Sequence, residues 1–166
     1  MSRFLLFDLG GVLADVDLGR AEDAWVSRGY ERSQFFDAFH ASGAKPLGDI
    51  GEVDAEGMRV RVEGYIRQPF SMDDLVHIWG AVVSWRPYVS DLLRRLKVPY
   101  GVLSTIDPIH ALALGPLPGA QPLVYSCDVG VTKPNPKIYD TAIARCPESA
   151  SAIRYIDDLP ENVRGA

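Results

Sequence analysis

Polar residues follow each of the four predicted strands, and these are the residues that can do chemistry. The strands are predicted where short apolar runs end in turn residues. Parallel strands present their carboxyl ends at one edge of a sheet, where ligands bind in open α/β folds, so the residues after them are expected to converge on one crevice. They are Asp8 after the run 4–7, Ser104 and Thr105 after 100–103, Lys133 and Pro134 in the loop after 123–125, and Asp157 and Asp158 after 153–156.

Asp8 has the properties expected of a nucleophile or of a metal ligand. The four large apolar residues before it, at 4–7, suit a central strand that is covered on both faces, and Gly10-Gly11 is where such a strand would break. The alternative is an ordinary turn aspartate at a strand end, since Asp and Gly are common turn residues. That alternative leaves the convergence of the four polar sets unexplained.

Helices and strands alternate along the rest of the chain, which favours an α/β fold with a parallel sheet. A helical block is expected between Trp25 and Trp85, and the tryptophans at 25, 79 and 85 are predicted to lie in its core. The segment 42–51 is predicted to be a loop because it holds three glycines and a proline. Helices are predicted at 17–30, 31–41, 54–67, 71–84, from Pro87 to Lys97, near 109–114 and at 136–145, with caps at Asp17 and Ser71.

Length and composition fit a globular protein with one core of ordinary size and a small accessory module. The chain has 166 residues and a net charge of -5, so no overall basic field attracts nucleic acid or anionic lipid. Cys127 and Cys146 lack the spacing of a metal site and are predicted to be reduced and structural, which favours a cytoplasmic setting. No stretch approaches the roughly 18 apolar residues of a membrane span, so a soluble, unprocessed protein is expected.

The four polar stretches, in this order and at these intervals, resemble the signature motifs of the haloacid dehalogenase superfamily, whose members are mostly phosphatases. The resemblance covers nearly the whole chain. It implies a Rossmann-like three-layer core formed by 1–16 and 86–166 and an inserted helical cap at 17–85, similar to the cap of sugar-phosphate phosphatases and of the amino-terminal domain of bifunctional epoxide hydrolases. The motifs are Phe7-Asp8-Leu9-Gly10-Gly11-Val12, Val102-Leu103-Ser104-Thr105, Gly130-Val131-Thr132-Lys133-Pro134 and Tyr155-Ile156-Asp157-Asp158-Leu159-Pro160-Glu161-Asn162.

The resemblance implies that Asp8 attacks phosphorus and forms an aspartyl-phosphate, which divides hydrolysis into two easier displacements. Mg²⁺ must lie between the attacking carboxylate and the phosphate dianion, because like charges repel. In the family the second carboxylate of the fourth motif, here Asp158, binds the metal together with Asp8 and the backbone carbonyl of Gly10, and Asp157 lies close by. Two adjacent acids with no metal would repel one another, although a solvated acidic turn is the alternative.

The same resemblance implies a phosphate-binding role for the second and third motifs. Ser104 and Thr105 offer a hydroxyl and backbone N–H groups to phosphoryl oxygens. Lys133 offers a compact positive charge to the nucleophile and the phosphate, and Pro134 stiffens its loop. A structural Ser-Thr strand end and a solvated lysine are the alternatives for these residues.

Gly10 departs from the family pattern, because typical phosphatases of the superfamily carry an aspartate there as general acid and base. Loss of such a group generally costs about 10²- to 10⁴-fold in rate, so weak activity or a preference for good leaving groups is expected. A branch of the family shares the Asp-Leu-Gly form and is still assigned phosphatase activity. The residues that can substitute for the missing acid are Asp15, Asp17, Asp107 and His110.

The end of the chain is the second departure. The family's sheet has a further strand after the fourth motif, whereas this sequence stops at Gly165-Ala166. The strand at 153–156 is therefore expected to be an exposed edge, as in a truncated chain, with edge-to-edge association in a homodimer as the alternative.

His40 and Lys45 are the cap residues that can face the crevice and select a substrate. A helix-end histidine and a solvated loop lysine are the simpler interpretation, because loops are exposed by default.

Together these features predict a cytoplasmic, Mg²⁺-dependent hydrolase of a small phosphorylated metabolite, such as a sugar phosphate, with no nucleic-acid or membrane partner. Dehalogenation of a haloacid by the same aspartate is the nearest alternative, but a metal-free site has no use for the paired charges of Asp157 and Asp158. A non-catalytic binding module is the third hypothesis, suggested by Gly10 and by the expected missing strand.

Overall fold

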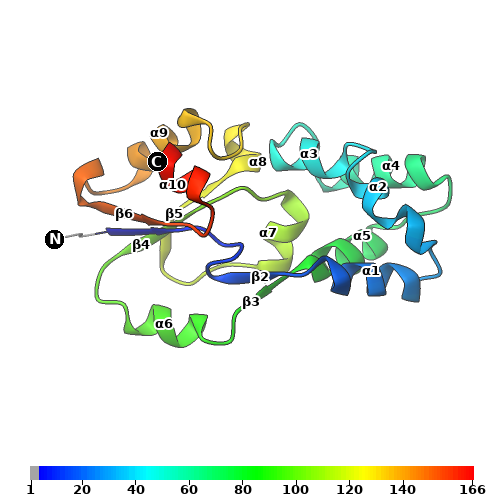
Figure 1. Ribbon diagram of the computed structural model, residues 1–166, viewed down its shortest axis with the longest axis horizontal. Coiled ribbons are helices and arrows are strands. Elements are labelled where there is room, and N and C mark those ends of the chain that lie inside the picture. Colours follow the sequence, from blue (N-terminus) through cyan, green and yellow to red (C-terminus); the bar gives the residue numbers. More distant parts are fainter. Residues whose placement is uncertain (1–3) are drawn as a thin grey trace.

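A four-stranded parallel sheet forms the α/β part of the molecule, as predicted (Figure 1). The computed structural model describes residues 4–166. The strand order is β5-β4-β1-β6, so the strand that precedes Asp8 is paired on both sides, and β6 lies at one edge. The strands are β1 (Phe4–Phe7), β4 (Tyr100–Ser104), β5 (Ala120–Tyr125) and β6 (Ile153–Ile156).

Helices cover both faces of this sheet, which explains why β1 is apolar along its whole length. Helix α9 (Pro136–Arg145) packs on one face, and α6 (Val89–Arg95) and α7 (Pro108–Leu114) pack on the other (Figure 1). Successive side chains of a strand point to opposite faces, so Phe4 packs with the α9 cluster and Phe7 with the α6 and α7 cluster.

Five helices between the first two motifs form a block at the other end of the molecule from the sheet (Figure 1). Two of them begin at the predicted caps. The side chain of Asp17 accepts hydrogen bonds from the backbone N–H groups of Gly19 and Arg20, and Ser71 and Asp74 form a reciprocal capping box. The helices are α1 (Leu18–Ser27), α2 (Phe35–Phe39), α3 (Ala44–Asp49), α4 (Ala55–Ile66) and α5 (Met72–Trp79).

Aromatic side chains fill the interior of this block. Trp25 and Trp79 are fully buried there, and Trp79 stacks on Phe39 with ring centroids 4.0 Å apart. The prediction for Trp85 was wrong, because that side chain packs against the α/β core, where its indole N–H donates to the Leu114 carbonyl at 2.8 Å.

A two-stranded antiparallel ribbon joins the helical block to the sheet, and the sequence did not predict it. It consists of β2 (Ala14–Val16) and β3 (Val83–Trp85). The helix predicted to run to Ser84 therefore ends at Trp79, and a 3₁₀ turn at Gly80–Val82 leads into β3. These strands have three residues each, which is too short for a period-two pattern to be visible.

The segment 42–51 was predicted to be a loop, but it contains α3. Pro46 lies within the first turn of that helix, where its missing N–H costs no hydrogen bond, and Gly43 precedes the helix with a φ of 81°. Helix α6 begins at Val89, two residues after the predicted start at Pro87, and ends at Arg95. The shorter helical segments are α8 (Ser126–Val129), α10 (Pro160–Gly165) and 3₁₀ turns at Arg32–Gln34 and Ala150–Ala152.

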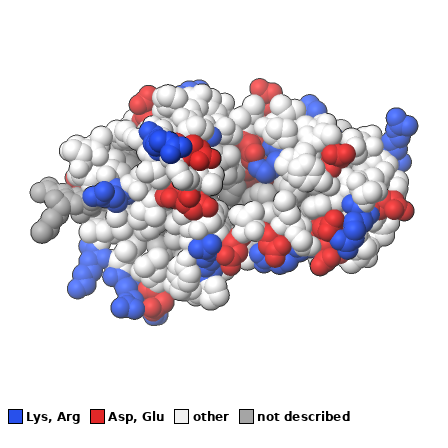
Figure 2. Space-filling view, viewed as in Figure 1, with Lys and Arg blue, Asp and Glu red and all other residues white. Residues whose placement is uncertain are grey.

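Side chains of both charges lie on the visible face of the molecule (Figure 2). Acidic and basic side chains are interspersed over the face shown in Figure 2. Within residues 4–166, no helix combines the length and the apolar character needed to cross a bilayer. Both cysteines are free and half-buried.

Gly51 lies close to the backbone of α8, at a contact between the helical block and the segment that follows β5. It has a φ of 68°, and a Cβ atom there would lie 1.9 Å from the backbone carbonyl oxygen of Cys127. Gly64, in the exposed face of α4, has open space around it instead.

Alanine at these two glycines is expected to change stability in opposite directions. Gly51→Ala forces a backbone displacement and an unfavourable φ, so it lowers the free energy of unfolding by more than about 1 kcal/mol. Gly64→Ala removes a helix-interior glycine and raises stability by about 0.5–1 kcal/mol. Urea unfolding followed by circular dichroism measures both changes, and equal effects of the two variants would contradict the close approach at Gly51.

Candidate active site

Asp8 and Asp157 are brought together by the pairing of β1 with β6. Phe7 lies opposite Ile156, and the backbone N–H of Asp8 donates to the Ile156 carbonyl at 2.9 Å. The carboxylates that follow the two strands therefore lie at the same edge of the sheet, although almost 150 residues separate them in the sequence.

The ammonium group of Lys133 lies between these two carboxylates. Its Nζ is 2.9 Å from Oδ1 of Asp8 and 2.6 Å from Oδ2 of Asp157, and all three side chains are almost fully buried. Burial raises the pKa of Asp8, while the attraction of Lys133 opposes that rise. The nucleophile predicted from the sequence is thus held by a cation in an environment that disfavours an unpaired charge.

Asp157 accepts hydrogen bonds at both oxygens from several donors. Besides Lys133, the backbone N–H of Leu159 donates at 2.9 Å, the amide of Asn162 donates at 3.0 Å, and the Tyr155 hydroxyl donates to Oδ2. Burial opposes ionisation of Asp157, but these hydrogen bonds, that of Lys133 foremost, lower its pKa below the ordinary value. The Asp157 oxygens are therefore used mainly to hold Lys133 and the start of α10.

Asp158 completes a group of three carboxylates suited to a hard divalent cation. One oxygen each from Asp8, Asp157 and Asp158 lie within 4.8 Å of one another. Three carboxylates and one ammonium leave two negative charges, which matches the charge of one divalent ion. Oxygen donors of this kind are those preferred by Mg²⁺, so the residues present fit the ion implied by the sequence resemblance.

The backbone conformation favours glycine at position 11, beside Asp158. Gly11 has a φ of 71°, and a Cβ atom there would lie 2.1 Å from an Asp158 carboxylate oxygen. Gly10 is half-buried and bridges to Ala14 at the start of the β2–β3 ribbon. Both glycines of the first motif line the crevice that contains the carboxylates.

The crevice brings together every site residue predicted from the sequence except Asp157, whose oxygens lie beside it. Ser104 is buried at the end of β4, and the Thr105 hydroxyl accepts a hydrogen bond from the backbone N–H of Lys133 at 3.1 Å. Thr105 therefore fixes the loop that supplies the lysine. The crevice has a volume of about 590 Å³ and is lined by Asp8, Gly10, Gly11, Asp15, Val16, Arg86, Ser104, Thr105, Lys133, Pro134, Asp158, Leu159, Glu161 and Asn162.

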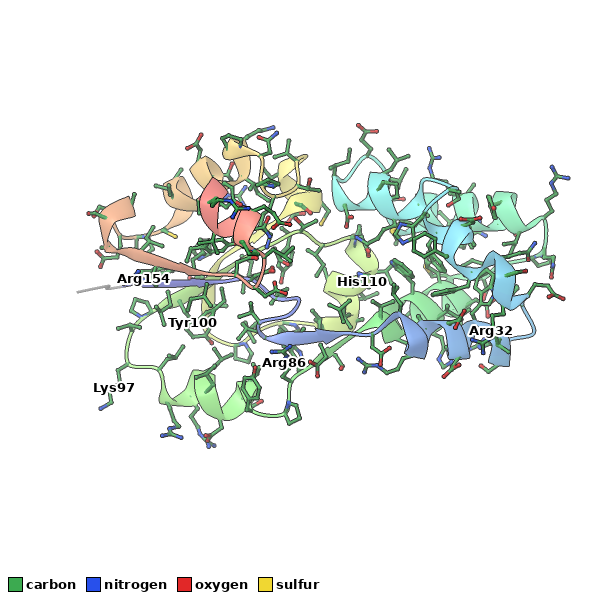
Figure 3. The ribbon with its side chains drawn as sticks, in the orientation of Figure 1. Arg32, Arg86, Lys97, Tyr100, His110 and Arg154 are labelled. Atoms are coloured by element: carbon green, nitrogen blue, oxygen red, sulfur yellow. The ribbon has the colours of Figure 1, made fainter. Side chains whose placement is uncertain are left out.

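Three residues that line this site or support it have roles that sequence analysis missed. Arg86 lies at the base of the β2–β3 ribbon (Figure 3), and its Nε is 2.7 Å from Asp15. Asn162 and Tyr155 hold Asp157. The fourth motif contains both Tyr155 and Asn162, and an amide in the first turn of the helix after two acids lies within reach of them. Nothing in the sequence singled out Arg86.

The four residues considered as substitutes for the missing acid have other partners. Asp15 pairs with Arg86, and Asp17 caps α1. Asp107 is fully buried, where its carboxylate accepts from the indole N–H of Trp79 and from His110 Nδ1, each at 3.0 Å. The other ring nitrogen of His110 (Figure 3) is 3.1 Å from the Trp79 carbonyl, so both nitrogens face acceptors.

His40 and Lys45 line a second cavity, of about 250 Å³, which adjoins the crevice at Gly10, Val16, Ser104 and Thr105. The expectation of a solvated loop lysine was wrong: Lys45 lies in α3, is half-buried and pairs with Asp49. His40 does lie at a helix end, as the C-cap of α2, but it faces the cavity. The remaining walls are mostly apolar and include Leu9, Trp79, Val82 and Ile106.

Comparison with known proteins links the chain to a phosphatase by sequence. No model of a known protein family matches the sequence. A D-ribitol-5-phosphate phosphatase of Bacteroides thetaiotaomicron is 25% identical over 177 residues, which covers 98% of this chain and 86% of that protein.

Solved structures with the same fold include HAD family enzymes and a haloacid dehalogenase. A HAD family enzyme from Bacteroides thetaiotaomicron, in complex with magnesium and inorganic phosphate, superposes with a TM-score of 0.86 at 21% identity, covering 99% of this chain and 89% of that one. A HAD-like family hydrolase from Porphyromonas gingivalis gives 0.82 at 23% identity, covering 99% and 86%. The L-2-haloacid dehalogenase from Xanthobacter autotrophicus gives 0.65 at 16% identity, covering 99% and 73%. The resemblance to the haloacid dehalogenase superfamily is thereby confirmed, and the chain has the fold of that superfamily's enzymes.

Proposed function

We propose that this protein is a Mg²⁺-dependent phosphatase that hydrolyses a small phosphomonoester through an aspartyl-phosphate on Asp8. The observation that supports this most strongly is the arrangement of Asp8, Lys133, Asp157 and Asp158 at one edge of the sheet. The crevice around them has room for a phosphoryl group and part of its leaving group. The division into a core, 1–16 and 86–166, and a cap, 17–85, is part of the same proposal.

Asp8 and Asp158, with the backbone carbonyl of Gly10, would hold the metal ion. When bound, Mg²⁺ reduces the repulsion between the Asp8 carboxylate and the phosphate dianion. Asp157 is a positioning residue in this proposal, because its oxygens already accept hydrogen bonds from Lys133, Tyr155 and Asn162.

Lys133 keeps the Asp8 side chain oriented and places a positive charge beside the attacking oxygen. Ser104 offers its hydroxyl to a phosphoryl oxygen at the end of β4, and Thr105 fixes the Lys133 loop. The Asp8 oxygen attacks phosphorus as the bond to the leaving oxygen breaks, and water then attacks the phosphorus of the aspartyl-phosphate and releases inorganic phosphate.

The comparisons support a sugar or polyol phosphate as the substrate class. The related curated protein is a phosphatase of D-ribitol 5-phosphate, and a structure with the same fold binds magnesium and phosphate. The second cavity of about 250 Å³ suits the carbon chain of such a compound. The acidic pair beside Asp8 and the lower similarity to the haloacid dehalogenase favour this proposal over metal-free dehalogenation.

Phosphate release from p-nitrophenyl phosphate tests the proposal directly. The purified protein is expected to release phosphate with Mg²⁺ and to stop when the ion is chelated. Asp8→Asn is expected to lower the rate to background, because an amide does not attack phosphorus. The proposal would be contradicted if Asp8→Asn still released phosphate, or if the protein released chloride from a haloacid without Mg²⁺. A folded protein with neither activity would favour a binding module.

The different roles assigned to Asp157 and Asp158 predict different kinetic defects. Asp158→Asn is expected to raise the Mg²⁺ concentration required for half-maximal activity. Asp157→Asn is expected to lower kcat by about 10- to 100-fold with a smaller change in that concentration, because Lys133 loses the group that positions it. Asp140→Asn, at an exposed site on α9, is the control.

Magnesium titration of the rate with each variant measures this difference. A larger change in magnesium dependence for Asp157→Asn than for Asp158→Asn would reverse the assignment.

A further inference from the structure

Gly10 leaves the leaving-group side of the crevice without the usual acid, and the second cavity begins at this residue. Three ionisable side chains line that cavity: His40, Lys45 and His110. The cavity shares Gly10, Val16, Ser104 and Thr105 with the crevice, so a leaving group bound beside Asp8 can extend into it. The ionisable side chains on its wall are therefore candidates to give a proton to the leaving oxygen.

Two of the three ionisable side chains are already engaged. The ammonium of Lys45 pairs with Asp49 and lies 3.8 Å from Asp107. His110 directs both ring nitrogens to acceptors, the Asp107 carboxylate and the Trp79 carbonyl.

His40 differs from both. The contacts of its ring with other side chains are aromatic, with Phe36 and Trp79, and the half-buried side chain lines the cavity. On this basis we propose that His40 is the catalytic acid and base of the reaction, a role that rests on the proposed phosphatase function.

The packing around His40 holds the ring at the cavity wall. It stacks on Phe36 with centroids 4.1 Å apart and an interplanar angle of 14°, and it meets Trp79 edge-on at 6.3 Å. The charged groups near it are Lys45 and Asp49 of α3 and Asp37 of α2. Burial, with a further contribution from Lys45, lowers the pKa of His40, whereas the two aspartates oppose that change.

The proton balance of the two steps follows. In the first step the bond from phosphorus to the leaving oxygen breaks, the bond from phosphorus to Asp8 forms, and the imidazolium of His40 gives its proton to the leaving oxygen. In the second step the neutral imidazole takes a proton from the attacking water, whose oxygen forms the new bond to phosphorus as the Asp8–phosphorus bond breaks. The histidine returns to its first protonation state, as an acid–base group must.

Substrates that differ in leaving group separate this role from a structural one. Alkyl phosphates such as ribitol 5-phosphate need a proton on the leaving oxygen, whereas p-nitrophenolate leaves as a stable anion. His40→Asn is expected to lower kcat/KM for the alkyl phosphate by about 10²-fold or more and to change that for p-nitrophenyl phosphate much less. His40→Gln should behave in the same way, and His77→Asn, at an exposed site on α5, should change neither.

The pH dependence gives a second readout. The first step needs the imidazolium form of His40, whose pKa lies below the ordinary histidine value. The kcat/KM for the alkyl phosphate, divided by that for p-nitrophenyl phosphate, is therefore expected to fall as pH rises through this pKa. In His40→Asn this ratio should lose that dependence.

Several outcomes would overturn the assignment to His40. One is that His40→Asn lowers kcat/KM equally for both substrates, and another is that it lowers kcat/KM for neither. The third is that Lys45→Met lowers kcat/KM for the alkyl phosphate alone while His40→Asn does not. Wild-type protein that hydrolyses p-nitrophenyl phosphate with Mg²⁺ keeps the proposed function in place whichever of these is found. Wild-type protein that hydrolyses neither substrate would overturn both proposals.

Discussion

The buried ion pairs of Lys133 are the interaction on which the rest of this site depends. A buried carboxylate is costly unless it is paired and hydrogen-bonded, and Asp8 and Asp157 share one ammonium between them. The remaining two negative charges, once Asp158 is counted, match the charge of one divalent ion. This charge balance links the proposed nucleophile to the proposed metal site.

The sheet topology is what makes this charge arrangement possible. Because β1 is central and pairs with β6 on one side and β4 on the other, the first and last motifs lie side by side, and the second lies next to the first. The β2–β3 ribbon then leads the chain from the crevice into the helical block and back, which places His40 and Lys45 over the same opening. The proposed nucleophile and the second cavity are thus supplied mainly by different segments, which meet at Gly10.

Much of this arrangement was predictable from the sequence, because it depends on the order of apolar and polar residues along the chain. The runs at 4–7 and 153–156 form strands, of which the first is largely buried and the second only partly, and polar residues at strand ends converge in any parallel sheet. Capping at Asp17 and Ser71 was predictable for the same reason, since a cap is a local interaction.

The features that were not predicted depend on contacts between distant segments. The strands of the ribbon have three residues each and pair across the whole helical block, the Trp85 indole donates to the Leu114 carbonyl at the end of α7, and α3 forms across two glycines and a proline. The hydrogen bonds that Tyr155 and Asn162 donate to Asp157 were also not predicted, although the family resemblance already implied that Asp158 rather than Asp157 is the main metal ligand of the pair.

Crystals soaked in Mn²⁺, with the ion located by anomalous diffraction, test the central claim most directly. The account predicts one ion bound by the carboxylates of Asp8 and Asp158, at oxygen distances of about 2.0–2.3 Å, while Asp157 stays paired with Lys133. An ion bound elsewhere, or Asp8 and Asp158 held too far apart to share it, would contradict the account.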